Sequence, residues 1–110
     1  MKRTSYTCGL DAAMDVIGGK WKPLFLWALM DGPMRPGELR RAVTGISERV
    51  LLTQLKQMEI SGLIERKAFP EIPLKVEYAL TAFGRSALEA LTPLGVWGDV
   101  SMSRIEAIPR

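Results

Sequence analysis

Apolar residues near the start of the chain recur with the period of an α-helix. Leu10, Met14 and Ile17 stand at i, i+4 and i+7, which puts them on one face of a short helix. The pair Gly18-Gly19 follows, and glycine commonly ends helices because it accepts left-handed dihedral angles. The pattern therefore predicts a first helix over about residues 8–17.

Two further helices are predicted before residue 45. The segment 23–30 is apolar on nearly every side, so we expect a central helix there that begins with its proline. Asp31-Gly32-Pro33 should stop this helix. A short third helix is expected over residues 36–43, with Leu39 and Val43 facing inward and Arg40 and Arg41 facing outward.

A fourth helix with two distinct faces is predicted over residues 48–60. Ser47 is a good N-cap in front of it, and Gly62 should end it. At 100° per residue, the apolar side consists of Leu51, Leu55 and Met58. The opposite side should carry the polar residues Arg49, Thr53, Lys56 and Gln57.

After Gly62 the hydrophobic period changes to two, which is typical of β-strands. We expect one strand over residues 63–69 and a returning strand over residues 75–80. Pro70 and Pro73 lie in the turn between them and predict a stiff tip outside the hydrogen-bonded ladder.

The last predicted element is helical, from Thr81 as a cap to about residue 107. Pro93, Gly95 and Gly98 predict a kink or break inside it. Its apolar stripe consists of Leu91, Leu94, Met102 and Ile105.

The predicted order of elements is four helices, a hairpin and a final helix. Two helices joined by a tight glycine turn and followed at once by a hairpin are the outline of a winged helix-turn-helix. We therefore expect a mainly α fold with a small β-hairpin, built as one domain over residues 1–110, because the chain has only 110 residues.

The composition narrows the class of function. A net charge of +3 is only mildly basic and suggests, without specifying, an anionic partner. The chain has no histidine, the commonest general base and metal ligand, and its one cysteine excludes an internal disulfide framework. No apolar run approaches the ~20 residues of a membrane span. We expect a cytoplasmic protein without cofactor, metal or membrane, and not an enzyme, since no glycine-rich phosphate loop or paired acid cluster stands in the sequence.

The polar side of the fourth helix is the candidate surface for double-stranded DNA. A helix fits the major groove, and the residues near its N-terminus, here Ser47 and Arg49, reach base edges first. Arg49 could pair bidentately with a guanine, and Lys56 is a candidate for a phosphate contact. Thr53 and Gln57 could contact base edges or phosphates. The alternative is a solvated amphipathic helix, which normally shows the same pattern.

Cations before and after this helix in the sequence favour the DNA interpretation. Neutralising phosphates supplies most of the nonspecific affinity for DNA. Each lysine alone could serve only solubility, so the argument rests on the placement of the five together. They are Arg40, Arg41, Arg66, Lys67 and Lys75.

Several motifs in a fixed order between Cys8 and Gly98 carry a family resemblance. They are Asp15–Trp21, Asp31–Pro33, Glu38–Arg41, Gly45–Leu51, Glu59–Arg66, Pro70–Tyr78, Leu80–Ser86 and Trp97-Gly98. Each is weak alone, but their order and spacing are specific. By them the chain resembles the HxlR-type family of winged helix-turn-helix transcriptional regulators, relatives of the MarR type.

The resemblance implies a homodimeric regulator of bacterial type that binds a palindromic operator. It places the dimer interface in the first and last helices, about residues 8–17 and 81–107, and the helix Ser47–Ile60 in the major groove. By position, it implies DNA contacts from Ser47, Arg49, Thr53 and Lys56 and, on the wing, from Lys75. The chain departs from the family pattern at two positions: Gly9, where relatives usually have proline, and Gly95, where they often have cysteine.

Cys8 stands just before the first predicted helix. A helix N-terminus carries partial positive charge, which favours the reactive thiolate, and Lys2 and Arg3 could add to this. The resemblance points to a switch that responds to oxidants or electrophiles at this place. With one cysteine per chain, the product would have to be a bridge between subunits or a mixed disulfide with a small thiol. The alternative is a small buried packing residue.

Two other questions stay open from the sequence. Trp21, Trp27 and Trp97 are expected in the core or an interface, although Trp21 and Trp97 could instead line a ligand cavity between subunits. The alternative to a DNA-binding regulator is a protein-interaction module, in which the wing and last helix bind another protein and the basic residues are incidental.

Overall fold

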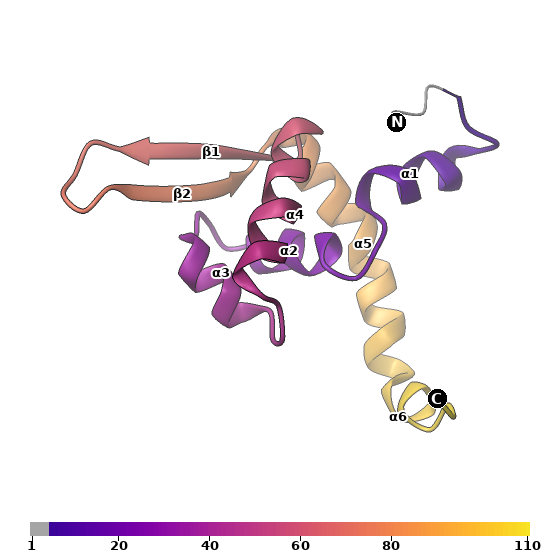
Figure 1. Ribbon diagram of the computed structural model, residues 1–110. Helices are drawn as coiled ribbons and strands as arrows, with labels where there is room; N and C mark the ends of the chain where they lie inside the picture. The colour runs from indigo at the N-terminus through magenta and orange to yellow at the C-terminus, as the bar shows by residue number, and fades with distance from the viewer. Residues whose placement is uncertain (1–4) are drawn as a thin grey trace.

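Six helices and one two-stranded hairpin make up residues 5–110, the part of the chain that the computed structural model describes (Figure 1). The order of elements agrees with the prediction, so the mainly helical class with a hairpin is confirmed. The elements are α1 (Gly9–Ile17), α2 (Lys22–Ala28), α3 (Pro36–Ala42), α4 (Glu48–Ile60), β1 (Ile64–Phe69), β2 (Lys75–Leu80), α5 (Ala82–Val100) and α6 (Met102–Glu106).

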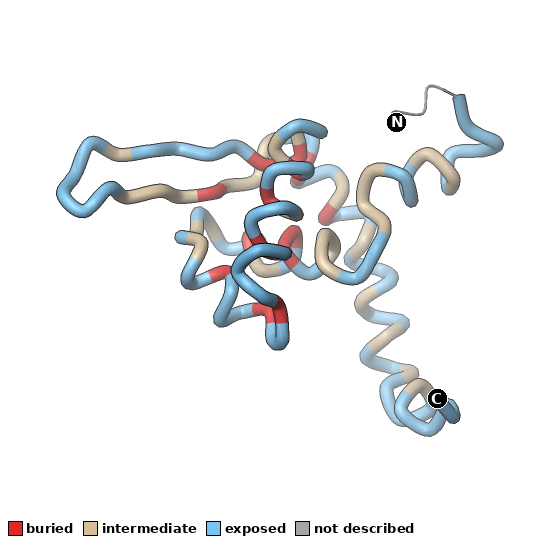
Figure 2. Tube along the Cα trace, in the orientation of Figure 1, coloured by how far each residue is buried: buried red, intermediate tan, exposed pale blue. Residues whose placement is uncertain are grey.

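The hydrophobic core lies where α2, α3, α4 and the root of the hairpin meet (Figure 2). Phe25, Leu26, Leu39 and Leu55 are fully buried there. Burial of one such side chain stabilises the fold by roughly 1.5–3 kcal/mol. The core therefore fixes α4 and the hairpin root in one unit.

Only one side of α2 is buried in the hydrophobic core. Phe25 and Leu26 are fully buried, whereas Leu24 and Trp27 are each 45% exposed. The expectation of burial on nearly every side was thus wrong for half of the helix. The helix has seven residues, and the core covers only one of its sides.

The hairpin is antiparallel and pairs Ile64 with Leu80 and Phe69 with Lys75. Residues 70–74 lie outside the ladder, as the prolines predicted, and the Ile72-Pro73 peptide bond is cis. Met34 adds a short bridge to the free edge of β2, since its backbone exchanges hydrogen bonds of 2.9 and 2.8 Å with Tyr78. The hairpin projects from the body as a wing (Figure 1).

The last helical region has the expected extent but breaks at a different place. α5 continues through Pro93, Gly95 and Gly98 and ends at Val100, so the predicted break lies instead at Ser101, before α6. Proline removes one backbone donor, which leaves the carbonyl of Glu89 without its helical partner. Because Glu89 is exposed, water can donate a hydrogen bond to that carbonyl, and the helix tolerates the proline.

The start of α5 is fastened to the root of the wing. The Thr81 hydroxyl oxygen accepts a hydrogen bond from the Gly84 amide at 3.0 Å, and the hydroxyl faces the carbonyls of Gly62 and Leu63 as a donor. A Cβ atom on Gly84 would collide with the Leu63 carbonyl. Glycine here lets the helix lie directly against the chain entering β1.

The two ends of the described chain extend away from the core (Figures 1 and 2). No residue of α1 or α6 is buried. Leu10 on α1 is 71% exposed and Val100 at the end of α5 is 83% exposed. Within residues 5–110, no helix combines the length and the apolar character needed to cross a membrane.

Candidate DNA-binding surface

The helix α4 presents one face to the core and one to solvent. Its N-terminus is capped by Ser47, whose hydroxyl oxygen accepts a hydrogen bond from the Val50 amide at 3.1 Å. Leu51, Leu55 and Met58 are at most 2% exposed, which confirms the predicted apolar side. The side chains that the sequence placed opposite them, Arg49, Thr53, Lys56 and Gln57, are all exposed.

The side chains on the exposed polar face of α4 differ in whether they already form hydrogen bonds or ion pairs within the chain. Within residues 5–110, the side chains of Arg49 and Lys56 have no hydrogen bond or ion pair, so their charges remain available. The Thr53 hydroxyl donates to the Arg49 carbonyl at 3.0 Å and keeps only acceptor capacity. Ser47 has used an acceptor position as the cap, and its hydroxyl hydrogen remains free to donate.

The turn between α3 and α4 is held by one of the predicted cations. Arg40 donates from Nε to the carbonyl of Ile46 at 3.3 Å, and Gly45 takes a φ of +87° in the turn. Ile46 is buried, so the turn is anchored on both sides. Arg40 therefore positions α4 while its remaining guanidinium nitrogens stay exposed, as does the neighbouring Arg41.

The wing separates its three cations onto two faces. The register puts Lys67 opposite Glu77 and Lys75 opposite Phe69, and both lysine ammonium groups lie over the Phe69 ring, 5.2 and 4.7 Å from its centroid. Arg66 pairs with Tyr78 and belongs to the other face of the hairpin. The five cations thus flank α4 but do not form one patch.

Lys75 has a partner that the sequence interpretation missed. Its Nζ lies 3.5 Å from Oε2 of Glu77, and both side chains are about three-quarters covered. The two residues stand two apart in a strand, and residues two apart share a face. The alternation of the strand could therefore have shown that the two side chains share a face, but not that they form an ion pair.

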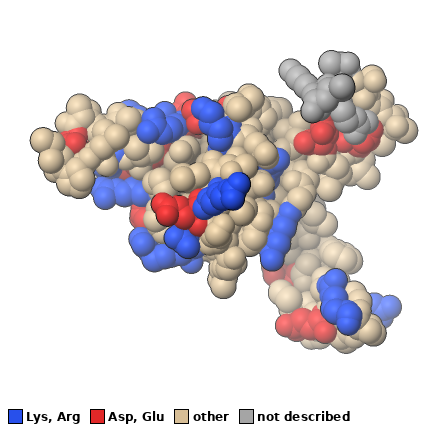
Figure 3. Space-filling model, viewed as in Figure 1, with Lys and Arg blue, Asp and Glu red and all other residues tan. Residues whose placement is uncertain are grey.

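The charges are distributed unevenly over the visible face of the molecule. Lysine and arginine side chains lie over the wing, α3 and α4 with acidic side chains between them, whereas the charged side chains seen over α1 are mainly acidic (Figure 3). Cations thus lie near α4 on this face, and they favour contact with a polyanion.

Cys8 occupies the N-cap position of α1 with an extended backbone (φ −161°). Its thiol is free and exposed, and makes no capping hydrogen bond. The alternative of a buried packing residue is therefore wrong for this chain. Lys2 and Arg3 lie outside the described residues.

The tryptophans do not share one environment. Trp21 is half-buried against the core, whereas Trp97 is exposed. Of three hollows on the described chain, Trp27 lines two, and neither Trp21 nor Trp97 lines any of the three. Among residues 5–110, no group of three or more histidine, cysteine or acidic side chains is arranged to hold a metal ion.

Fold and surface together define a winged helix-turn-helix protein in which α4 exposes Arg49 and Lys56. The family of HxlR-like helix-turn-helix proteins matches residues 16–106. The chain is 43% identical over 93 residues to the HTH-type transcriptional regulator YkvN of Bacillus subtilis, covering 84% of this chain and 79% of YkvN. It is also 43% identical over 101 residues to an HTH-type transcriptional regulator of Methanothermobacter thermautotrophicus, covering 92% and 77%.

Solved structures show the same likeness. The redox regulator HypR in its reduced form superposes with a TM-score of 0.85 at 35% identity, covering 92% of this chain and all of HypR. Diamide-treated YodB from B. subtilis superposes with a TM-score of 0.72 at 32% identity, covering 86% and 95%. The chain belongs to the HxlR-like helix-turn-helix family and is a DNA-binding transcriptional regulator.

Proposed function

We propose that two copies of this chain form a homodimer that binds a palindromic operator, with α4 of each copy in a major groove. The observation that carries this proposal is α4 itself: its apolar side is buried to 2% or less, and its cationic side is exposed and unpaired within the described chain. In a two-fold dimer, the two helices should meet major grooves one helical turn apart, roughly 34 Å.

The proposed contacts follow from the free groups on each side chain. Arg49 pairs with a base edge, and Lys56 with a phosphate. Ser47 donates to a phosphate, Thr53 accepts a hydrogen bond and Gln57 contacts an edge or a phosphate. The flanking phosphates are contacted by Arg40, Lys67 and Lys75. This role is binding and not catalysis, and we place it in the cytoplasm, where prokaryotic chromosomes lie.

Exposed apolar side chains at both ends of the chain support the dimer. Leu10 on α1 and Trp97 and Val100 on α5 are 60% exposed or more. Leaving large apolar groups in water is unfavourable by roughly 25 cal/mol per Å². We propose that the terminal helices, about residues 8–17 and 81–107, cover these groups with those of the second copy.

Fluorescence anisotropy with labelled promoter DNA from upstream of the gene tests the proposal. We expect a dissociation constant on the order of 1–10 nM at physiological salt. Unlabelled DNA of the same sequence should compete for binding, and a scrambled duplex should not. The logarithm of the affinity should fall steeply against that of the salt concentration. A folded protein that shows no preference for any promoter fragment over the scrambled duplex would favour the protein-interaction module instead.

Cys8 supports a second proposal, that oxidation regulates DNA binding. The thiol is free and exposed, and two of the structural relatives are HypR, named as a redox regulator, and YodB, solved after diamide treatment. Two Cys8 thiols from two copies can form one disulfide while a quinone takes up the two electrons and two protons to become a hydroquinone. In Cys8→Ser, quinone should no longer change the operator affinity. An unchanged response in that variant would remove Cys8 from the mechanism.

A further inference from the structure

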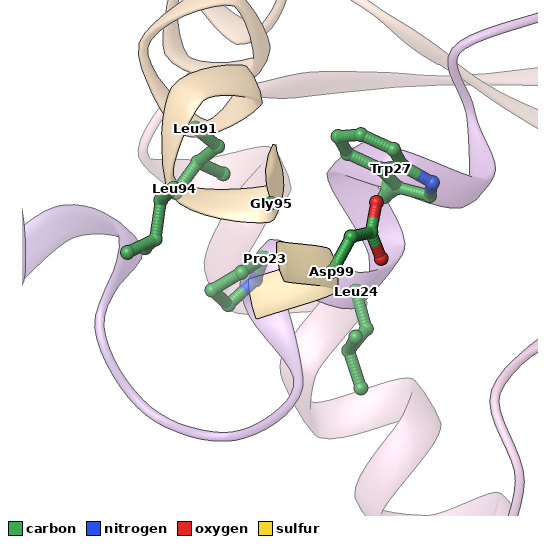
Figure 4. A pocket seen from close by; sticks show the side chains of 7 residues that line it. All are labelled: Pro23, Leu24, Trp27, Leu91, Leu94, Gly95 and Asp99. Carbon is green, nitrogen blue, oxygen red and sulfur yellow. The ribbon is translucent and has the colours of Figure 1, made fainter. Parts of the chain in front are cut away.

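A hollow of about 300 Å³ lies between α2 and α5, on a part of the molecule that the proposed DNA contacts do not use. Pro23, Leu24 and Trp27 line it from α2, and Leu94, Gly95 and Asp99 line it from α5 (Figure 4). Most of this lining is apolar. A hollow of this size is at the small end of ligand-binding sites.

Gly95 keeps the hollow open. A Cβ atom placed on Gly95 would lie 3.4 Å from Cη2 and from Cζ3 of the Trp27 indole, so the backbone of α5 stands directly beside the ring. A side chain longer than one carbon would have to extend over the ring or into the space beside it. The absence of a side chain at this position thus leaves the indole accessible to another molecule.

The only charged residue that lines the hollow is acidic. Within residues 5–110, the Asp99 carboxylate has no hydrogen bond and no ion pair. Asp99 stands in the last turn of α5, where the helix dipole adds further negative potential. Figure 4 shows its carboxylate turned toward the Trp27 side of the hollow.

A second hollow beside Trp27 has the same charge pattern. It shares Leu24 and Trp27 with the first hollow and is lined also by Asp31, again without a lysine or arginine. In a chain with a net charge of +3, both spaces around this indole are therefore bordered by acids alone. The face of an indole ring itself attracts cations.

We propose that the hollow between α2 and α5 binds a small hydrophobic organic cation, such as an aryl or alkyl ammonium. The apolar body of the ligand packs against Pro23 and Leu94, and its positive charge lies between the Trp27 ring and the Asp99 carboxylate. The shape and apolar lining select an organic molecule over a metal ion, and the acid selects a cation over a neutral compound or an anion. This site is separate from the proposed DNA contacts on α4, but Leu94, Gly95 and Asp99 lie within residues 81–107, so the proposal requires that the second copy in the proposed dimer leaves the hollow open.

Nuclear magnetic resonance of the full-length, ¹⁵N-labelled protein tests the site. The probe is benzyltrimethylammonium, and its uncharged carbon isostere, neopentylbenzene, is the matched ligand control. The indole N–H signal of Trp27, assigned with Trp27→Phe, should shift saturably as the cation is added. The dissociation constant for the cation should be about tenfold lower than that for the isostere. No shift of this signal, or equal affinity for the two compounds, overturns the proposal.

Two pairs of variants separate the charge from the shape of the hollow. Asp99→Asn should weaken binding of the cation about threefold, whereas Glu89→Gln, which removes an acid from α5 outside the hollow, should leave it unchanged. Gly95→Leu should abolish binding, whereas Gly98→Leu, where a Cβ meets only open space, should not. Thermal melts check that each variant is folded, and equal binding by wild type and Asp99→Asn contradicts the proposal.

A second copy of the chain is the competing occupant. If the dimer covers the hollow, the Trp27 signal will respond to the cation only in a monomeric variant such as Val100→Glu, and the site is then an interface and the proposal is wrong. Operator binding is measured without the cation. If the cation does not bind, the proposed DNA-binding function is therefore unaffected. If the operator does not bind, the cation titration can still be interpreted.

Discussion

The exposed guanidinium of Arg49 lies in the first turn of α4, the part of a recognition helix that reaches base edges first. No acidic group of the described chain is paired with it, so no internal ion pair has to be broken when DNA binds. The planar fork of arginine matches the two acceptors on the major-groove edge of guanine. Specificity at one base pair of each half-site should therefore depend on this residue.

Replacing Arg49 by alanine should weaken operator binding by about 1–3 kcal/mol and relax the preference at one base pair. Anisotropy titrations against a set of single-base operator variants measure both effects. Arg110→Ala, which removes an exposed cation outside both the proposed DNA contacts and the proposed dimer segments, serves as the matched control. Equal loss of affinity for every operator variant would assign Arg49 to a phosphate.

Ser47 illustrates a residue whose structural role the sequence reveals directly. An N-cap depends only on the residue itself and the next turn of the helix, so local sequence is sufficient, and the bond to Val50 confirms it. The pair of Lys75 with Glu77 was not foreseen, although both lie on one strand. Whether two long side chains on one face meet depends on their rotamers and on the packing against Phe69, which sequence spacing does not fix.

Ser47→Ala should lower the free energy of unfolding by about 1 kcal/mol, because the Val50 amide loses its partner. Ser47→Asn, which retains a capping oxygen, should stay near the wild-type stability. Urea denaturation at a fixed protein concentration measures the difference. A urea denaturation curve of Ser47→Ala that coincides with the wild-type curve would show that the cap contributes nothing.

Elements were predicted well where one residue type sets the boundary and poorly where packing decides. The ladder ends at Phe69 because proline follows, and α4 ends where Gly62 takes a φ of +81°. Proline was misleading inside α5: Pro93 sits on a solvent-facing stretch, where the lost hydrogen bond can be replaced by water, and the helix continues. The sequence shows a proline, but it does not show which side of a helix will be buried away from water.

The wing contributes to DNA affinity through Lys67 and Lys75 only if they reach phosphates. Lys75→Ala should reduce the slope of log affinity against log salt by about 0.9 per protomer, the value for one phosphate contact on duplex DNA. The slope comes from anisotropy titrations between low and physiological salt. Glu77→Gln, which frees Lys75 from its ion pair, should raise affinity slightly. An unchanged slope in Lys75→Ala would remove this residue from the contact surface.

At the scale of the whole molecule, the described chain is more extended than a compact domain. Its radius of gyration is 15.3 Å, larger than the roughly 13 Å typical of a compact domain of about this length. The wing, α1 and the end of α5 with α6 all extend from the core, and large apolar side chains on α1 and α5 are exposed (Figure 2). Association through these ends would bury what the monomer leaves in water.

Val100→Glu should shift the protein from dimer to monomer, since it places a charge among the apolar residues of the proposed interface. Analytical ultracentrifugation measures the change, and operator affinity should fall with it because each half-site is then bound separately. Ile72→Glu at the wing tip, where the side chain is also fully exposed, is the matched control and should remain dimeric. A dimeric Val100→Glu would place the interface elsewhere.

The missing side chain of Gly84 has a mechanical consequence. Because α5 rests directly on the carbonyl of Leu63, the helix and the hairpin that begins beside it are joined without a compressible layer between them. A hairpin arm of six residues per strand is about 20 Å long, so a 10° rotation at its root displaces the tip by about 3.5 Å. Any change in tilt between the two α5 helices of a dimer would therefore move the tip of each wing. That displacement is comparable to half the width of a minor groove.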